Sequence, residues 1–238
     1  ASGHYARVDT DPESGRRRMR RAADPEKDQT YFLYMLGQRA LRHTLFPLAE
    51  IDKDEVRSLA ERAGFPNHKK KDSTGVCFIG ERRFREFLSR YLPANPGEIR
   101  TDDGHVIGEH PGLMYFTLGQ RQGLRIGGIA DAPDEPWYVV GKDLQTNVLT
   151  VAQGHDNPLL YRDHLTAQQV HWISEHPPPQ EFRCMARCRH RQALQSCRVR
   201  QDGDRLSVLF DQPQRALTPG QSVVLYDGAV CLGGGIID

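Results

Sequence analysis

One of the five cysteines, Cys77, lies between two basic clusters in the segment KKKDSTGVCFIGERR, residues 69–83. A thiol reacts as its thiolate, and neighbouring cations lower the thiol pKa. A helix predicted to begin after Gly80 would add the positive end of its dipole. This setting makes Cys77 the strongest catalytic candidate in the chain. Free cysteines are also among the most buried residue types, so local sequence leaves open an inert, packed thiol.

A second set of chemistry-bearing residues is a pair of arginine-rich segments predicted to be strands. In EFRCMARCRHRQ, residues 181–192, alternation places arginines on one face and mostly apolar or thiol side chains on the other. A basic stripe of this kind suits RNA phosphates, because neutralising them releases counterions. A solubilising surface is the alternative. The predicted stripe contains Arg183, Arg187, Arg189, Arg191, Arg198 and Arg200, opposite Phe182, Cys184, Ala186, Cys188, Cys197 and Val199.

Cys184 and Cys188, with His190 nearby, have the residue types of a zinc site but not the spacing. Residues four apart in a strand share a face yet lie about 13 Å from each other, too far for two thiolates to bind one ion. We therefore expect no metal site, and we interpret these cysteines and Cys231 as core residues.

Residues 1–26 are predicted to form a hairpin, with Asp, Pro and Gly in the turn DTDPESG. Five of the six residues 16–21 are arginines on its returning strand. These side chains could hold phosphate, or they could be the solvated charges that protect an edge strand.

Further elements follow from spacing. A helix is expected over 30–42 with Phe32, Leu33, Leu36 and Ala40 on one face, and we interpret its aromatic residues as core. A capping box at Asp52 and Glu55 predicts a second helix that Gly64 ends. A third should begin after Gly80. The remaining expected strands lie around Ile99, Val106 and 137–140, and then recur from Val148 onward (VLTVA being the first) at the spacing of a small barrel.

Composition limits the class of protein. The chain has 238 residues, 38% of them hydrophobic, and 32 basic against 31 acidic residues. With a net charge of only +1, any nucleic-acid surface must come from local segregation of charge. An odd number of scattered cysteines argues against a disulfide scaffold, and no membrane span or secretory leader is evident. We expect a cytoplasmic protein, and the absence of an initiator methionine suggests the C-terminal portion of a longer one.

The segment KKKDSTGVCFIGERRFREFLSRYLPANPG resembles the signature of the bacterial tRNA-specific 2-thiouridylases, which place sulfur on the wobble uridine of tRNA. The resemblance extends over essentially the whole chain. It is carried further by SGHYAR, KDQTYFLYML, GEHPGLMYFTLGQRQGL, EPWYVVGKD and TPGQSVVLYDGAVCLGGGII.

The resemblance implies a three-part fold. Residues 1–80 would be the α/β tail of a PP-loop (adenine nucleotide alpha hydrolase-like) domain carrying the cysteine loop. Residues 81–145 would form a small, mostly β central domain, and residues 146–238 a β-barrel that binds tRNA.

It also implies an activity. ATP with Mg²⁺ would activate the C2 oxygen of the wobble uridine, and a persulfide on Cys77 would replace that oxygen with sulfur. The tRNAs would be of the Lys, Glu and Gln type, and a sulfur-relay donor protein would load the cysteine. The family's ATP loop and its second cysteine lie upstream of this sequence, so we expect the chain alone to be inactive.

Site residues are implied in the same way. Gly3 would lie against the nucleotide. The implied tRNA contacts are His4, Lys27, Asp28, Gln29, Arg189, His190 and Gln221. Many family members carry tyrosine at the position of His190.

A different class of function remains open from the residues themselves, namely an RNA-binding module whose Cys77 is structural. Reactivity of that thiol separates the two interpretations, since a buried thiol resists alkylation. RNA methyl transfer has no support, because no methyl-donor loop of the strand, glycine-rich turn and helix type is present.

Overall fold

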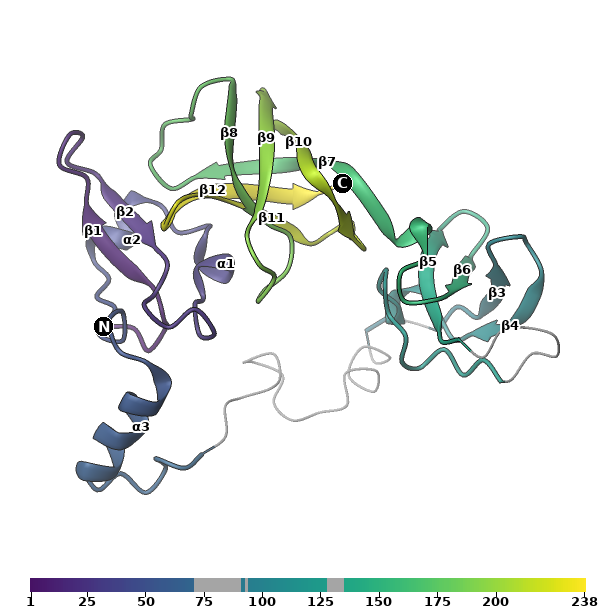
Figure 1. The fold of residues 1–238 in the computed structure, drawn as a ribbon, viewed down its shortest axis with the longest axis horizontal. Helices are drawn as coiled ribbons and strands as arrows, with labels where there is room; N and C mark the ends of the chain where they lie inside the picture. Colours follow the sequence, from purple (N-terminus) through teal and green to yellow (C-terminus); the bar gives the residue numbers. More distant parts are fainter. Residues whose placement is uncertain (71–90, 93, 128–134) are drawn as a thin grey trace. The chain divides into compact units, whose positions relative to one another are not determined.

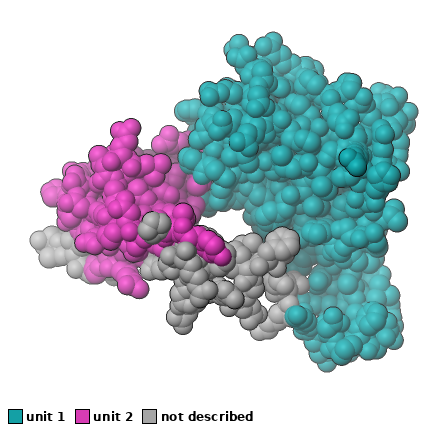
Figure 2. Space-filling view, turned by 180° about the vertical axis from the view of Figure 1, so that it is seen from behind, with its two compact units in different colours: residues 1–70, 163–213, 219–238 teal, residues 71–162, 214–218 magenta. Residues whose placement is uncertain are grey.

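The computed structural model describes residues 1–70, 91–92, 94–127 and 135–238. Cys77, its basic clusters from residue 71 on, and the helix predicted after Gly80 lie outside the described residues. The chain divides into two compact units (Figure 2). The first contains residues 1–70, 163–213 and 219–238, and the second contains 71–162 and 214–218.

Six strands of the first unit form a closed barrel (Figure 1). Their order is β12-β11-β8-β9-β10-β7, and pairing of β7 with β12 closes the circle. Because the barrel is closed, each of the six strands has a neighbouring strand on both sides. The small barrel predicted from the strand spacing is confirmed. The strands are β7 (Tyr161–Trp172), β8 (Glu181–Arg187), β9 (Gln195–Asp202), β10 (Arg205–Arg215), β11 (Ser222–Asp227) and β12 (Val230–Ile237).

The N-terminal hairpin extends this sheet. Strands β1 (Arg7–Thr10) and β2 (Arg17–Arg20) pair antiparallel, as predicted, and Gly15 in the turn has a φ of 67° that suits glycine. Strand β2 then pairs with β12 at Val230 and Cys231. The hairpin is therefore held by the end of the chain that is most distant in sequence.

The helix predicted over 30–42 is two short helices, α1 (Thr30–Leu33) and α2 (Gln38–Arg42). Gly37 caps α2 with an extended conformation, φ −89° and ψ −179°, which ends any continuous helix. The interpretation of the aromatic residues as core is wrong for Phe32, which is 59% exposed, and right for Tyr31 and Tyr34.

Helix α3 (Lys53–Arg62) confirms the predicted capping signals. The Asp52 carboxylate accepts a hydrogen bond from the Glu55 amide at 2.8 Å. Gly64 follows the helix with a φ of 72°. None of the helix's residues is buried.

The core of the first unit joins the hairpin, both short helices and the barrel. Side chains from segments more than 200 residues apart contact one another in it, so these parts fold as one body. Its buried members are Ala6, Met19, Tyr31, Tyr34, Leu41, Phe46, Ile173, Val224, Tyr226 and Cys231.

The second unit is a four-stranded sheet in the order β4-β3-β6-β5, in which β3 and β6 are parallel. The strands are β3 (Gly97–Thr101), β4 (Val106–His110), β5 (Trp137–Asp143) and β6 (Val148–Gln153), with two 3-10 turns, η1 (Leu113–Tyr115) and η2 (Pro158–Leu160). The expectation that VLTVA, the first segment from Val148 onward, is a barrel strand is therefore wrong, because β6 belongs to the sheet of the second unit. Its apolar residues Leu149 and Val151 are buried against Ile99 and Val139 of the second unit instead.

Within the residues described, no helix combines the length and the apolar character that crossing a membrane requires.

Strand β12 contains three consecutive glycines, residues 233–235, and the backbones of the neighbouring strands β7 and β11 approach them too closely for a side chain. A Cβ added to Gly234 would clash with the backbone carbonyl of Val223. We expect Gly234→Ala to lower the free energy of unfolding by about 1–3 kcal/mol, the usual range for overpacking. Urea unfolding measures this. Gly108→Ala is the control, because a Cβ there makes only ordinary contact at 3.7 Å with Ile99; equal losses in both variants would contradict the prediction.

Candidate nucleic-acid interface

Asp28 is a buried carboxylate, 1% exposed, that binds two arginines. Its Oδ2 atom lies 3.3 Å from Nη1 of Arg187 and 3.6 Å from Nε of Arg21. Its Oδ1 atom accepts hydrogen bonds from the Ala22 amide at 3.3 Å and the Thr30 hydroxyl at 3.0 Å. These contacts tie the loop between β2 and α1 to barrel strand β8. The carboxylate is engaged inside the protein, and its predicted contact with RNA stays a prediction.

Arg187 corrects the predicted basic stripe, because it is 4% exposed rather than on the surface. The outer face at this end of β8 is covered by the segment containing Asp28 and Tyr31, so both faces of the strand are buried there. The guanidinium also lies 5.7 Å from the centre of the Tyr226 ring. The alternation of side chains along the strand predicts that Arg187 faces solvent, because it gives no information about a segment that covers the outer face.

The other arginines of the stripe lie in two places, and all are exposed except Arg189, which is half-buried. Arg183 pairs with Arg198 across β8 and β9, and Arg200 is exposed farther along β9. Arg183 also forms an ion pair with Asp211. Arg189 and Arg191 come after β8 has ended, in the turn toward β9.

Gln29 connects two of the predicted site segments. The side-chain oxygen of Gln29 accepts a hydrogen bond from the backbone amide of Tyr5 at 2.9 Å. The backbone amide of Gln29 donates to the Tyr5 carbonyl, also at 2.9 Å. His4 precedes Tyr5, is exposed, and its Nδ1 lies 2.8 Å from the Ser2 hydroxyl. A Cβ added to exposed Gly3 would meet no atom within 4 Å, so its backbone is open to a close approach.

Tyr31 connects the other two segments. Its hydroxyl shares one proton between the carbonyls of Cys188 and Ser222, at 3.1 and 3.0 Å. These residues are the direct neighbours of Arg189 and Gln221, two of the predicted RNA contacts. Burial raises the pKa of Tyr31 to about 12, so the hydroxyl keeps its proton at neutral pH and can donate it.

Phe32 is a site residue that sequence reasoning missed. Its ring centre lies 4.6 Å from that of His190 and 5.4 Å from that of Tyr31. Burial and the positive charges of Arg191 and Arg187 lower the pKa of His190, so its ring is neutral at neutral pH. An exposed phenyl ring beside a neutral imidazole can stack on a nucleobase. No sequence signal distinguishes Phe32, because a helical pattern does not reveal which aromatic residue faces solvent.

Apart from Cys77, the predicted site residues therefore come from four segments that belong to one unit. Residues 3–4, 27–29 and 189–190 are joined by the contacts of Gln29, Asp28 and Tyr31, and Gln221 lies next to Ser222. Cys77 lies outside the described residues, and its position relative to this surface is a prediction.

The four cysteines that the structure describes are packed rather than reactive. Burial raises the pKa of Cys188 to about 12 and also raises the pKa of Cys231. The pKa of Cys184 is raised first by its hydrogen bond with Cys197, whose Sγ lies 3.7 Å away, and then by burial. In the described part of the chain, no three His, Cys, Asp or Glu side chains gather where they could hold a metal.

Comparison with protein families gives three matches in chain order. Residues 1–81 match a model described as tRNA methyl transferase HUP domain. Residues 85–153 match the corresponding PRC-barrel domain, and residues 162–237 match an aminomethyltransferase β-barrel domain. These matches agree with the expected nucleotide-hydrolase tail, small central domain and C-terminal barrel.

Individual relatives match the whole chain. Proteins named tRNA-specific 2-thiouridylase MnmA are 60% identical in Methylococcus capsulatus, 55% in Alcanivorax borkumensis and 55% in Escherichia coli O1:K1. Each match covers 100% of this chain but only 64%, 65% and 64% of the relative. The chain thus spans slightly less than two thirds of the length of these relatives. Their names specify thiolation, whereas the descriptions of the domain models mention methyl transfer.

Alkylation should distinguish Cys77 from the other thiols. With iodoacetamide at neutral pH, we expect Cys77 to react at least about tenfold faster than the rest, because cations favour its thiolate whereas burial protects the others. Peptide mass spectrometry measures each site, and repetition in urea is the control that exposes every thiol. Protection of Cys77 until unfolding would favour the structural interpretation.

Removing the Asp28 carboxylate should destabilise the first unit strongly. Asp28→Ala leaves Arg187 buried without its charge partner, which costs about 3–5 kcal/mol for pairs of this kind. Trp172 fluorescence during urea unfolding, in a Trp137→Phe background, reports on this unit. Asp211→Ala is the control, because its pair with Arg183 is exposed and should matter much less. Similar losses in the two variants would contradict a special role for Asp28.

Proposed function

We propose, because this chain belongs to the family of the tRNA-specific 2-thiouridylases, that its protein modifies tRNA by placing sulfur on the wobble uridine. The single observation that carries the proposal is the match at 54–60% identity along the entire chain, which includes the segment around Cys77. The described geometry supports it, because the segments expected to contact tRNA converge on one unit.

Cys77 is the proposed sulfur carrier. Its sulfur would bear a second sulfur as a persulfide, whose outer atom would attack C2 of the uridine and displace the activated oxygen. A second cysteine thiol would then attack Cys77, which breaks the S–S bond, leaves the sulfur on the uridine and forms a disulfide with Cys77. Lys69 and Lys70, which are exposed, and the arginines at 82 and 83 would favour the anionic form. A sulfur-relay protein is the proposed donor, and the cytoplasm, where thiols stay reduced, is the proposed compartment.

ATP with Mg²⁺ would supply the activation of the uridine oxygen. The contact that this chain offers is the open backbone at Gly3, where the absence of a side chain permits close approach. Gly3 also lies beside His4 and, through Tyr5, beside Gln29, so nucleotide and tRNA would meet at neighbouring residues.

RNA contacts divide by chemistry. Lys27 and Arg189 would bind phosphate, which positions the tRNA without reading its sequence. His190 and Phe32 offer ring faces to a base, and His4 and Gln221 offer polar groups. Asp28 would act from inside the protein, by holding Lys27 and Gln29 against β8. The tRNAs of Lys, Glu and Gln type are the proposed substrates.

The decisive variant is Cys77→Ser in the full-length protein. We expect tRNA binding to stay nearly unchanged and thiolation to be abolished, because a hydroxyl cannot carry a persulfide. Nucleoside mass spectrometry of tRNA from cells that contain only the variant measures 2-thiouridine. Cys184→Ala is the matched control, since its thiol is packed against Cys197 and should be dispensable. Normal 2-thiouridine with Cys77→Ser would leave the alternative, a tRNA-binding module with a structural cysteine.

A further inference from the structure

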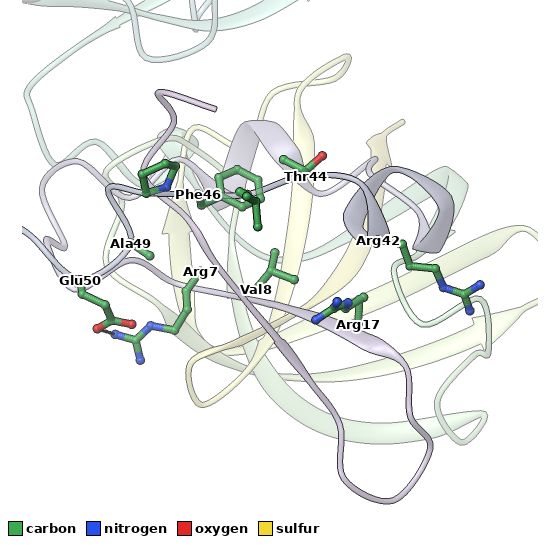
Figure 3. A pocket seen from close by; sticks show the side chains of 10 residues that line it. Arg7, Val8, Arg17, Arg42, Thr44, Phe46, Ala49 and Glu50 are labelled. Atoms are coloured by element: carbon green, nitrogen blue, oxygen red, sulfur yellow. Dashed lines mark hydrogen bonds and ion pairs between the residues drawn. The ribbon is translucent and has the colours of Figure 1, made fainter. Parts of the chain in front are cut away.

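A cavity of about 420 Å³ lies between the hairpin and the loop that follows α2, and none of the residues expected to contact tRNA lines it (Figure 3). Three arginines from three different elements line it. Arg7 comes from β1, Arg17 from β2, and Arg42 from the last turn of α2. The remaining lining residues are Val8, Thr44, Leu45, Phe46, Pro47, Ala49 and Glu50.

Four of the five arginines in residues 16–21 have acceptors within the protein that account for them, and one differs. The acceptors are carboxylates or a carbonyl, which explains these four side chains as structural. The pairs are Arg18 and Arg20 with Asp9, at 2.8 and 3.0 Å, Arg21 with Asp28 at 3.6 Å, and Arg16 with the Ser174 carbonyl.

Arg17 is the exception. Its side chain donates to the neutral Thr10 hydroxyl at 2.9 Å, and no acidic partner is found for it among the residues described. Arg42, which is exposed, likewise has no acidic partner in the described part of the chain. Arg7 forms an ion pair with Glu50. The cavity therefore has three guanidinium groups against one carboxylate, and two of the three cations are not neutralised by a described residue.

The walls of the cavity combine an apolar side with charged side chains, which suits a nucleotide. Val8, Phe46 and Ala49 form an apolar side, and Leu45, 71% exposed, stands at the rim, so the cavity opens to solvent. Thr44 is the only neutral polar side chain among the lining residues. The cavity thus offers apolar surface together with guanidinium groups, which suit the phosphates that position an RNA.

We propose that this cavity binds one nucleotide of an RNA backbone, with its phosphate on Arg17 and its sugar or base face against the wall at Phe46. Arg42, which points away from Arg17 (Figure 3), would bind a neighbouring phosphate. The proposal rests on the proposed function in that the RNA would be the tRNA substrate. It adds an anchoring point that involves none of the residues expected to contact the target base. Such a contact would hold the tRNA by its shape and charge rather than by its sequence.

Arg17→Gln and Arg42→Gln test the proposal in the full-length protein. Filter binding of an unmodified tRNA transcript, and of polyuridylate as an unrelated RNA, is measured over a series of salt concentrations. We expect each variant to bind both RNAs several-fold more weakly. The slope of log K against log salt should become less negative by about 0.7–0.9 for each lost phosphate contact.

Arg39→Gln is the matched control, because Arg39 lies in the same helix, is exposed, and does not line the cavity. It should bind both RNAs nearly as well as the unchanged protein. Arg42→Lys, which keeps the charge, should lose less affinity than Arg42→Gln. Thermal unfolding checks that all variants fold.

Two results would overturn the site. Equal losses with Arg39→Gln would mean diffuse attraction rather than a cavity, and unchanged affinities with Arg17→Gln and Arg42→Gln would mean that its occupant is not RNA. Neither result touches the thiolation assay of Cys77→Ser. Conversely, loss of RNA binding in the cavity variants would support the site even if Cys77→Ser left 2-thiouridine normal.

Discussion

The ion pair between Asp28 and Arg187 is the contact on which the arrangement of the first unit depends. Both side chains are almost completely withdrawn from water, so the desolvation of two charges must be offset by their attraction and by additional hydrogen bonds. Asp28 receives these from Ala22 and Thr30, and Arg21 supplies a second cation. Such a pair tolerates few alternative geometries, which gives the loop between β2 and α1 one position on the barrel.

That position matters because side chains at either end of the pair face a common surface. Lys27 and Gln29 flank the carboxylate, while Arg189 and His190 follow the guanidinium within three residues. Tyr31 strengthens the connection with its hydroxyl, which stays protonated because burial opposes ionisation. Segments that are distant in sequence thereby come together, and they carry cations, a polar amide and two ring faces.

Local signals in the sequence were sufficient for several elements. The hairpin turn, the cap at Asp52 and the barrel strands each depend on neighbours within a few residues, so short patterns predict them. Three features depend on distant parts of the chain and could not be predicted in this way. The helix that apolar spacing would continue is interrupted between α1 and α2, Arg187 is covered by a segment distant in sequence, and strand 148–153 pairs in the second unit. The exposure of Phe32 likewise depends on which residues α1 packs against. The resemblance supplied candidate positions, but it did not indicate that Asp28 is buried.

Strand β12 pairs with β2, β11 and β7, and this has a consequence for synthesis on the ribosome. Strand β2 is translated about 200 residues before β12, its partner, so its pairing edge stays open until β12 has been synthesised. Contacts this distant in sequence slow folding and leave unpaired edges available to other chains. The nascent protein should thus depend on chaperones until residue 237 has left the exit tunnel, and truncations that remove β12 should aggregate rather than yield a smaller folded domain.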